Sequence, residues 1–439
     1  MRLEVSNFAK IKHANIRMDG ITVIAGENNT GKSTIGKILY SIFNSLYGID
    51  TRVEASRRNE IVSRCRGIIR NTLMQKEREG NWESNIRPSR SVELASRDLI
   101  TRLRKADMFL INDLELRNMM YEVSEKYGMQ VEKDVVEEFV EETLRTIEFV
   151  NETDDYTIAM ELIERYFNSV FSNQIGNLGN DKLTEINLAI QDKEIRFAFF
   201  ENRCTLWKTN IELLHEAFFV DDPFILDELD YPYIEQKATR SLLVDKIGKI
   251  NINVGEDGSI VNAILAKEKL KEIFDILNKV VPGKIEDSNG EWALSTEKYS
   301  EPIRFDNLSA GLKSFILLKI MLEKGILKEK DVLILDEPEI HLHPEWQIKY
   351  AEIIVLLQKK FDLSIIVTTH SRDFFEAIEL FSKKYQIINK CSFYLSKQIE
   401  GDVEFEDVSE DIAQIYKHLV TPSRLLDKLK FELEENDNE

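Results

Sequence analysis

Short apolar runs separated by polar residues open the chain, and a longer amphipathic segment follows them. β-Branched and aromatic residues cluster between polar breaks in three strand-like segments, residues 2–8, 12–18 and 21–25. In residues 33–48 the apolar positions recur every three or four residues, which predicts a helix. A glycine-rich segment, residues 26–34, joins the third predicted strand directly to this helix.

The middle of the chain has a different texture, with long charged stretches whose apolar positions follow helical spacing. Residues 133–150 are an example. No sustained heptad and no internal repeat runs through this region, so a compact or short-armed lobe is favoured over a long coiled coil. The pattern predicts one mostly helical insertion, residues 51–245.

Strand-like alternation returns near residue 246 and then alternates with helical segments. The elements expected after that point are strands at 249–253, 284–296 and 302–307, a helix from 309, a buried strand at 332–337, a helix at 344–360, a buried strand at 364–369, and a terminal strand pair with two helices. This alternation predicts an α/β fold with a mainly parallel sheet flanked by helices. We expect residues 1–50 and 246–439 to form one head that the insertion interrupts.

Charge and cysteine usage narrow the class of protein. The net charge is −20, from 78 acidic and 58 basic residues, so a protein that coats nucleic acid or an anionic membrane with its whole surface is excluded. Cys65, Cys204 and Cys391 show no metal-ligand or disulfide spacing. The first residues lack the apolar core of a signal peptide, and no apolar run is long enough to span a bilayer. We therefore expect a soluble cytoplasmic protein without a membrane partner.

The glycine-rich segment matches the phosphate-binding pattern GxxxxGK[ST]. In this pattern backbone N–H groups close around phosphate oxygens at the positive end of the following helix. Lys32 would reach the β- and γ-phosphates of ATP, and Ser33 would ligate Mg²⁺. The residues expected to bind ATP are Gly26, Glu27, Asn28, Asn29, Thr30, Gly31, Lys32, Ser33 and Thr34. A chance match in an ordinary turn is the alternative, and the flanking strand and helix argue against it.

Two later strands end in residues that suit the same chemistry. Asp336 ends one apolar strand, where it would hold Mg²⁺ near Ser33, and Glu337 is the candidate base that polarises water. His370 follows the next strand, at the edge where open α/β sheets bind ligands, and would contact the γ-phosphate. Taken alone, these residues would be a capping acidic turn and a structural histidine. Their position beside a phosphate-binding loop favours catalysis, with Lys32 as the third catalytic residue.

The segment Asn307 to Ser314, NLSAGLKS, begins a predicted helix. Ser309 is a good N-cap, and Ser-Ala-Gly at a helix start offers hydroxyl and N–H donors to an anion. With this segment the chain carries four motifs in order, GENNTGKST, LSAG, ILDEPE and TTHS. In that order they resemble the nucleotide-binding head of the ABC superfamily, in its RecF, chromosome-maintenance and OLD-like branch.

Within that branch, DEPEIHLHPEWQ, LSAGLK and the ending DVSEDIAQIYKHLVTPSRLLDKL resemble the stand-alone AAA ATPases of bacterial antiphage systems of the Septu type. The resemblance covers about residues 1–50 and 246–420. It implies a head-to-tail homodimer, in which Ser309 and Gly311 of one chain complete the ATP site of the other. Two departures are the Leu312-Lys313 ending of the signature and the lack of a recognisable glutamine loop.

Two further groups of residues have alternative readings. His341 and His343 have no third metal ligand nearby in sequence, so a structural or dimer-contact role is favoured over metal binding. The basic stretch at the start of the insertion would contact nucleic-acid phosphates or would pair with the acidic segment that follows it. Its arginines are Arg57, Arg58, Arg64, Arg66 and Arg70.

Together these features predict an ATP-hydrolysing dimeric switch, the ATPase and sensor subunit of an antiphage defence complex. Its effector, such as a nuclease, is expected on a separate chain, because no further acidic metal cluster follows His370. One alternative is a DNA-repair or chromosome-maintenance ATPase that acts directly on DNA. Less favoured alternatives are a transporter ATPase subunit, which the long separation of Lys32 from Asn307 opposes, and a non-hydrolysing scaffold.

Overall fold

The computed structural model describes residues 1–79, 90–107, 110–129, 131–177, 182–230, 237–249, 270–288, 291–399 and 401–436. The chain divides into two compact units. The sheet unit comprises Met1–Tyr47 and Ile163–Glu439, and the helical unit comprises Gly48–Leu162.

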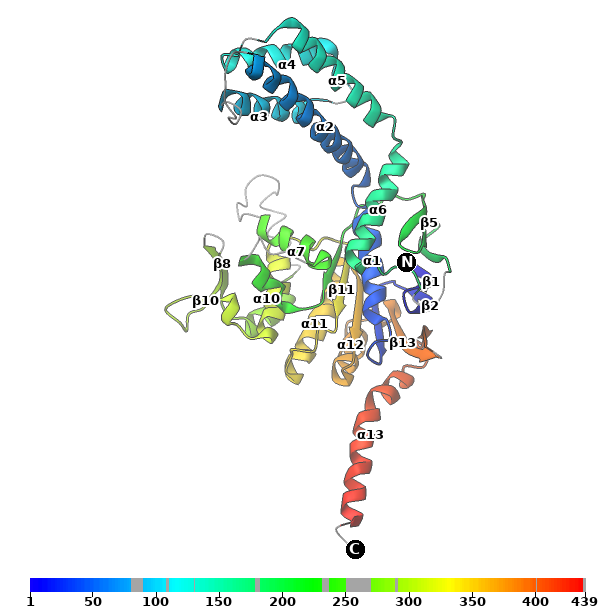
Figure 1. The fold of residues 1–439 in the computed structure, drawn as a ribbon. Coiled ribbons are helices and arrows are strands. Elements are labelled where there is room, and N and C mark those ends of the chain that lie inside the picture. The colour runs from blue at the N-terminus through cyan, green and yellow to red at the C-terminus, as the bar shows by residue number, and fades with distance from the viewer. Residues whose placement is uncertain are drawn as a thin grey trace. The chain divides into compact units, whose positions relative to one another are not determined.

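A sheet of eleven strands organises the described part of the sheet unit (Figure 1). Its strand order is β6-β5-β4-β1-β2-β14-β13-β3-β12-β11-β7. The bounds are β1 Arg2–Phe8, β2 Ile11–Arg17, β3 Ile21–Gly26, β4 Thr184–Ile190, β5 Lys193–Phe200, β6 Arg203–Thr209, β7 Ala217–Val220, β11 Val332–Asp336, β12 Ser364–Thr369, β13 Cys391–Ile399 and β14 Asp402–Asp407.

The two halves of this sheet have different strand directions, which follow from their sequences. Strands β13, β3, β12, β11 and β7 pair in parallel, and β3, β11 and β7 are almost uninterrupted apolar runs, as strands covered on both faces require. Strands β6, β5, β4, β1 and β2 pair antiparallel, and β1 and β5 alternate buried with more exposed positions. The predicted α/β class, with an antiparallel part and a mainly parallel part, is confirmed.

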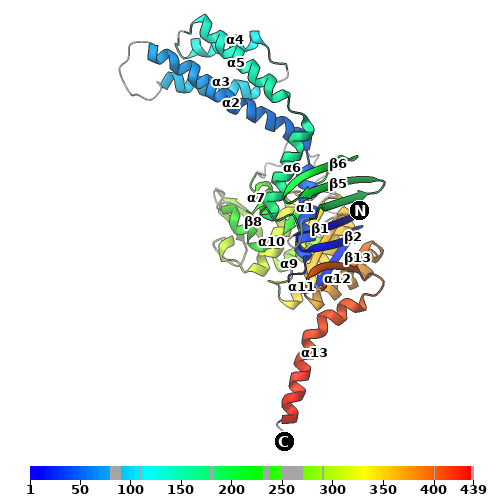
Figure 2. The same cartoon turned by 45° about the vertical axis from the view of Figure 1, so that its right-hand side comes forward.

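Helices flank the parallel half, and two of them, α11 and α12, pack directly against each other (Figure 1). Ser309 and Ser371 cap α10 and α12 by accepting hydrogen bonds from Leu312 N (3.4 Å) and Phe374 N (3.2 Å), and Pro344 begins α11. The bounds are α1 Lys32–Leu46, α7 Ala238–Lys249, α9 Lys271–Val280, α10 Ala310–Glu323, α11 Pro344–Phe361, α12 Arg372–Lys384 and α13 Ala413–Asn436, with 3₁₀ turns at Pro223–Asp230 (η1), Phe305–Asn307 (η2) and Ile388–Lys390 (η3). Helix α13 begins beside the sheet and extends away from it (Figure 2).

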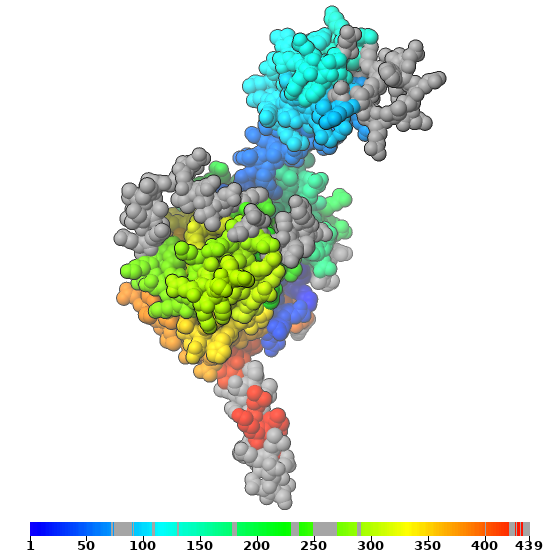
Figure 3. Space-filling view, turned by 90° about the vertical axis from the view of Figure 1, so that its left-hand side faces the viewer, coloured from blue at the N-terminus to red at the C-terminus, as the bar shows by residue number. Residues whose placement is uncertain are grey.

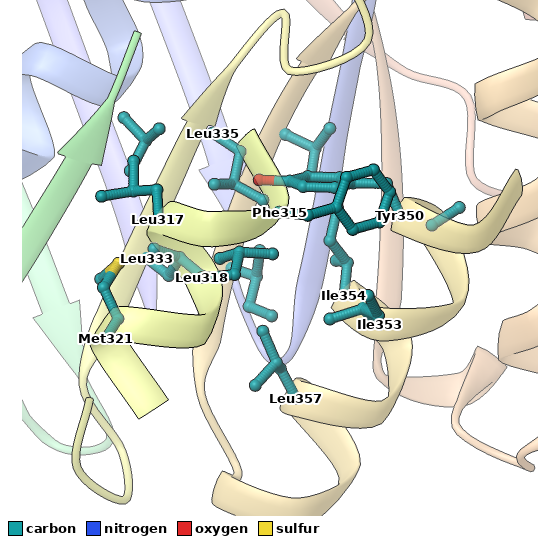
Figure 4. Packing of buried hydrophobic residues seen from close by; sticks show 14 of the residues in the cluster. Phe315, Leu317, Leu318, Met321, Leu333, Leu335, Tyr350, Ile353, Ile354 and Leu357 are labelled. Carbon is teal, nitrogen blue, oxygen red and sulfur yellow. The ribbon is translucent and has the colours of Figure 1, made fainter. Parts of the chain in front are cut away.

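The main apolar core lies where α10 and α11 meet β11 (Figure 4). Phe315 of α10 meets Tyr350 of α11 edge to face, with ring centroids 5.2 Å apart. Leu333 and Leu335 of β11 are fully buried beneath these helices. The strand that ends in Asp336 is therefore held in place by its two neighbours in the sheet and by the helices that cover it.

A second, three-stranded sheet joins α9 to α10. Its order is β10-β9-β8, all antiparallel, with bounds β8 Lys284–Ser288, β9 Glu291–Ser295 and β10 Ile303–Arg304. On the face shown in Figure 3, this stretch forms one continuous surface of the sheet unit (residues 270–330, yellow-green). The strand-like segment expected at residues 284–296 is confirmed as β8 and β9, whereas of the strand expected at 302–307 only Ile303–Arg304 is a strand and Phe305–Asn307 forms the turn η2.

The helical unit has an apolar core of its own. Its helices are α2 Ile49–Glu79, α3 Arg90–Lys105, α4 Asp113–Lys126, α5 Lys133–Asn151 and the first part of α6 Asp155–Phe171. Cys65, Leu99, Met120 and Phe139, one from each of the first four helices, are buried together. These helices form one compact unit, Gly48–Leu162, where a compact or short-armed lobe was expected within residues 51–245.

The insertion is shorter than the sequence analysis predicted. Residues 51–245 were expected to form one mostly helical insertion, but the helical unit ends at Leu162 and the next strands, β4 to β7, belong to the large sheet. Phe167 of α6 packs against Phe197 and Phe199 of β5, and β7 contacts α1 and α7. The strand expected at 249–253 lies, apart from Lys249, outside the described residues.

Two expectations drawn from composition can be compared with the structure. Cys65, Cys204 and Cys391 are all buried free thiols. None of the described helices combines the length and the apolar composition that crossing a bilayer requires.

Candidate functional site

The predicted phosphate-binding loop lies between β3 and α1. Gly31 has φ 69°, a left-handed conformation that glycine adopts without strain, and it leads directly into the first turn of α1. Thr30 is buried and donates a hydrogen bond to Glu27 O (2.7 Å), whereas the side chains of Glu27, Asn28 and Asn29 are exposed. A hydrogen bond within the loop thus joins Thr30 to Glu27, while three of its side chains stay accessible to solvent. The loop lies at the N-terminal end of a helix, where the helix dipole is positive.

Lys32 is held inside the loop. Its ammonium donates hydrogen bonds to the carbonyls of Gly26 (3.2 Å) and Glu27 (2.7 Å), and it lies 3.9 Å from Glu337 Oε1. Burial lowers the pKa of Lys32, and the nearby carboxylates of Glu337 and Asp336 oppose that shift. A cation with few water contacts beside a loop of backbone donors is suited to a polyphosphate.

Ser33 and Asp336 supply oxygen donors at the same edge of the sheet. The Ser33 hydroxyl is hydrogen-bonded to the Asp336 carboxylate, and the Thr368 hydroxyl donates to Asp336 Oδ1 at 2.7 Å. Burial raises the pKa of Asp336, and these two hydrogen bonds oppose the rise. Hydroxyl and carboxylate oxygens are ligands that Mg²⁺ accepts in phosphate sites, where it keeps several waters, so the pair fits this ion.

Glu337 and His370 meet next to Lys32. His370 Nε2 lies 2.9 Å from Glu337 Oε1, and this contact is the main cause of a lowered pKa at Glu337. Glu337 has φ 50°, a strained conformation for a residue with a side chain, and its N–H donates to Thr368 O (3.2 Å) and Thr368 Oγ1 (3.0 Å). The structure brings together all three residues predicted to be catalytic.

Ser309 and Gly311, predicted from the signature motif, lie at the start of α10. A side chain at position 311 would place its Cβ 2.8 Å from the carbonyl oxygen of His341 and 3.4 Å from the Trp346 ring. Gly311 is therefore needed within its own chain for the close approach of α10 to the loop after β11. A role for Ser309 and Gly311 at a second chain's nucleotide is a separate question, which the proposal below addresses.

This arrangement agrees with a comparison of the sequence with protein families. The model described as "AAA ATPase domain" matches residues 1–375. The chain belongs to the AAA ATPase domain family. The resemblance to ABC-superfamily ATPases inferred from its motifs is confirmed with it.

Two relatives of this AAA ATPase match over short stretches. A putative ABC transporter ATP-binding protein of Clostridium acetobutylicum is 27% identical over 124 residues, which are 28% of this chain and 42% of the relative. Septu protein PtuA of Bacillus thuringiensis is 32% identical over 139 residues, which are 28% of this chain and 30% of the relative. Each match spans less than half of the relative.

Among solved structures, an SMC head bound to the C-winged helix domain of ScpA has a TM-score of 0.45 at 13% identity. The alignment covers 94% of this chain and 98% of that one. The SMC head domain from Thermotoga maritima has a TM-score of 0.37 at 10% identity, with coverage of 93% and 98%.

The structure also places the residues whose roles were open. His343 N-caps α11 through its backbone, and the His341 ring meets Phe224 edge to face at 5.7 Å. No group of three or more histidine, cysteine or acidic side chains arranged to hold a metal ion is found among the described residues. Both histidines thus have structural contacts within their own chain.

The basic stretch is partly used inside the helical unit. Arg57 is buried and donates to Val150 O (2.8 Å) and Asp155 Oδ1 (2.7 Å), and Arg64 pairs with Glu60 at 2.6 Å. The acidic segment after the stretch thus supplies one of its partners, which was one of the two expected outcomes. Arg58, Arg66 and Arg70 are exposed.

The sequence analysis missed two groups of residues at the site. Asp221 and Asp222 follow β7, whose last residue Val220 pairs with Leu335, so these carboxylates lie beside Asp336 and line a small hollow with Glu337. The signal was AFFVDD, an apolar run ending in acids as VLILDE does, but it lay within the presumed helical insertion.

The second group consists of one residue, Ser396 of β13, which contacts the phosphate-binding loop and the strand before it. Its hydroxyl lies 2.6 Å from Thr30 Oγ1 and donates to Ala25 O at 3.2 Å. A Cβ at Gly26 would lie 2.0 Å from the Ser396 hydroxyl oxygen, so the first glycine of the motif is required by this neighbour. No local sequence signal marks Ser396, because its role arises only from strand pairing.

The Lys32→Ala variant of this AAA ATPase should bind ATP at least about tenfold more weakly than the wild type, because it loses a charge-assisted contact worth about 1.5 to 3 kcal/mol. Isothermal titration calorimetry with ATP and Mg²⁺ measures the affinity. Lys359→Ala, at an exposed lysine on α11 that stacks over Tyr385, is the matched control and should bind like the wild type. Equal affinity in Lys32→Ala and wild type would contradict the assignment of the loop.

Proposed function

We propose that this chain binds and hydrolyses ATP as a dimeric switch, and that it is the ATPase and sensor subunit of an antiphage defence complex. In this proposal it controls a separate effector protein, such as a nuclease. The observation that carries the hydrolytic part is the contact of Glu337 with both Lys32 and His370 beside the phosphate-binding loop. Membership of the AAA ATPase domain family supports the same chemistry.

The reaction assigned to the site is attack of water on the γ-phosphate. Lys32 and the backbone donors of the loop bind the phosphates, and Glu337, kept ionised by His370, accepts a proton from water. His370 orients Glu337 and places a polar group where negative charge develops. Ser33 and Asp336 would hold Mg²⁺, which supplies charge neutralisation to the phosphates when bound.

The dimer is inferred from the signature motif. In the ABC-type heads that this chain resembles, the motif of one chain meets ATP on the other, and here Ser309 and Gly311 would do so. Ser309 and its helix N-terminus are suited to an anion, and the Ser309 side chain is exposed at the surface of the sheet unit. Exposed Ile340 and Phe224 lie on the neighbouring loops, next to His341. A surface with donors and apolar side chains supports pairing with a second copy, closed by ATP and opened by hydrolysis.

The defence role rests on the match to Septu protein PtuA and on the motif forms DEPEIHLHPEWQ and LSAGLK. A direct action on DNA has less support, since Arg57 and Arg64 of the basic stretch pair inside the helical unit. Hence we assign recognition of a partner, rather than coverage of nucleic acid, as the output of the switch.

Glu337→Gln should lower the rate of phosphate release by about 100-fold or more, because an amide does not accept the proton from water. The same variant should accumulate, with ATP, as a species of twice the chain mass in light scattering. Adding Ser309→Arg should return it to the monomer mass while ATP still binds. Glu345→Gln, at an exposed glutamate of α11, is the control and should hydrolyse like the wild type. A mass that is independent of ATP in both variants would sink the dimer mechanism.

His370→Ala should move the acid limb of the pH–rate profile to higher pH. The histidine contact holds the pKa of Glu337 below its usual range, and burial opposes this, so the carboxylate of the variant takes up a proton at a higher pH than in the wild type. The profile of residual phosphate release, normalised to its plateau, measures the shift. An acid limb at the same pH in both proteins would refute the contribution of His370 to the ionisation of Glu337.

Bacteria that express this chain with its native neighbouring genes should resist phage, and Glu337→Gln should abolish the resistance. Loss is expected because the switch would no longer cycle. The efficiency of plating on matched strains measures the effect, with Glu345→Gln as the control that retains protection. Equal plating on wild type and on a strain without the genes, across a phage panel, would argue for one of the other settings.

A further inference from the structure

Glu339 is a buried carboxyl between the catalytic loop and the loop that carries His370. It lies two residues after Glu337, and only 4% of its surface is exposed. Neither the phosphate-binding loop nor the Mg²⁺ ligands use it. A glutamate this deeply buried requires compensating hydrogen bonds, so the groups that it contacts indicate its role.

One oxygen of Glu339 accepts hydrogen bonds from three consecutive residues. Oε1 accepts hydrogen bonds from Thr369 Oγ1 (2.6 Å), His370 N (2.9 Å) and Ser371 N (3.3 Å). The backbone on both sides of the His370 Cα is therefore fixed to a single side chain. Because a side chain swings from its Cα, this anchor determines where the His370 ring can reach.

A second set of bonds fixes Glu339 itself and the helix that follows His370. The Gln347 amide donates to Glu339 O (3.3 Å) and to Leu342 O (3.1 Å), and its oxygen accepts from the Ser371 hydroxyl at 2.7 Å. The Ser371 hydroxyl in turn caps α12. Glu339 thus belongs to a network that joins the start of α11 to the start of α12.

The loops after β11 and β12 are joined at two places on either side of the Glu337 and His370 pair. Glu337 N–H donates to Thr368, and Glu339 accepts from His370 N–H. Between these ties, His370 Nε2 lies 2.9 Å from Glu337 Oε1. The first tie includes a bond between backbone atoms, Glu337 N–H to Thr368 O, that no substitution at residue 368 removes, whereas the second depends on the Glu339 side chain.

We propose that Glu339 is a positioning residue that fixes the His370 backbone and thereby holds the imidazole against Glu337. It acts on hydrolysis through His370 and does not touch the nucleotide. The kinetic part of this inference rests on the proposed hydrolysis by Glu337, whereas the placement of the loop does not.

The chemistry of the site predicts which substitutions preserve this role. Oε2 of Glu339 is buried and makes no hydrogen bond with the described residues, and burial raises the pKa of this carboxyl. All three hydrogen bonds to Glu339 need only an acceptor at Oε1. A glutamine keeps that acceptor at the same reach, an aspartate is one methylene too short, and an alanine has none.

The first test compares ATP hydrolysis by Glu339→Ala, Glu339→Asp and Glu339→Gln. The alanine and aspartate variants should lose about 10- to 100-fold in kcat with KM changed less than about threefold, because a catalytic group is misplaced while substrate binding is kept. Glutamine should restore kcat to within about threefold of the wild type, because the acceptor is retained. Thr369→Val, which removes one of the three donors, should give an intermediate loss. A rise in KM with unchanged kcat, or a glutamine variant as slow as alanine, would overturn the proposal.

A double-mutant comparison with His370→Ala shows whether Glu339 acts through the histidine. If it does, the double variant with Glu339→Ala should be about as slow as His370→Ala alone, because the same contribution is removed only once. Losses that multiply would mean that the two residues act independently and would refute the proposal.

Hydrogen exchange provides a readout that needs no hydrolysis. The amides of residues 370 and 371 should exchange faster in Glu339→Ala than in the wild type, with the phosphate-binding loop unchanged. Glu379→Ala is the matched control, since Glu379 is a buried glutamate of α12 that bonds to Lys383 and Tyr416 instead. It should lower the melting temperature without changing kcat or exchange at residues 370 and 371.

The outcomes separate this inference from the proposed function. If the wild type releases no phosphate, the proposed function fails, and the exchange measurement still tests the Glu339 anchor. If the wild type hydrolyses ATP and Glu339→Ala matches it in kcat and exchange, only this inference fails.

Discussion

A shared register of parallel strands brings the site together. Thr368 pairs with both Ile24 and Asp336, and Leu335 pairs with Val220, so β3, β12, β11 and β7 end at the same edge of the sheet. Three of these strands are followed at once by the residues that carry chemistry. Because side chains alternate between faces, a slip of one residue in any pair would turn the catalytic loop away from its partners.

Balance of charge within this edge is the second constraint. One ammonium, Lys32, faces the carboxylates of Asp336 and Glu337, and all three are at least partly removed from water. Burial opposes the charged forms of Lys32 and Asp336, while His370 keeps Glu337 ionised. Loss of one member would leave the remaining buried charge uncompensated, so binding and protonation at the site are coupled.

Local signals explain which parts of this arrangement the sequence could predict. Lys32, Asp336, Glu337 and His370 stand at the junctions of apolar strands with loops, where hydrophobic pattern and motif agree, and the structure brings them together. Strands β4 to β7 were missed because they lie among the charged residues of a region that was expected to be helical, and because β4 and β7 join the sheet through β1 and β11, far away in sequence. Asp221 and Asp222 were missed together with β7, and Ser396 was missed because its contact with the phosphate-binding loop arises only from the pairing of β13 with β3. The motif containing Glu339 was visible, but its three hydrogen bonds depend on the pairing of β11 with β12.

The unusual ending of the signature motif has its explanation in this fold. Lys313 is 2% exposed, and its ammonium bonds both oxygens of Asp227, at 2.6 and 2.7 Å, within the turn η1 that follows Asp221 and Asp222. A buried lysine left without Asp227 would cost about 3 to 5 kcal/mol, so α10 and η1 are expected to move as one body. Since η1 continues directly from the strand beside Asp336, this ion pair links the signature helix to the carboxyl end of β7. Lys313, at which the motif differs from the transporter form, thus connects the surface that would meet a second nucleotide with the chain's own catalytic edge.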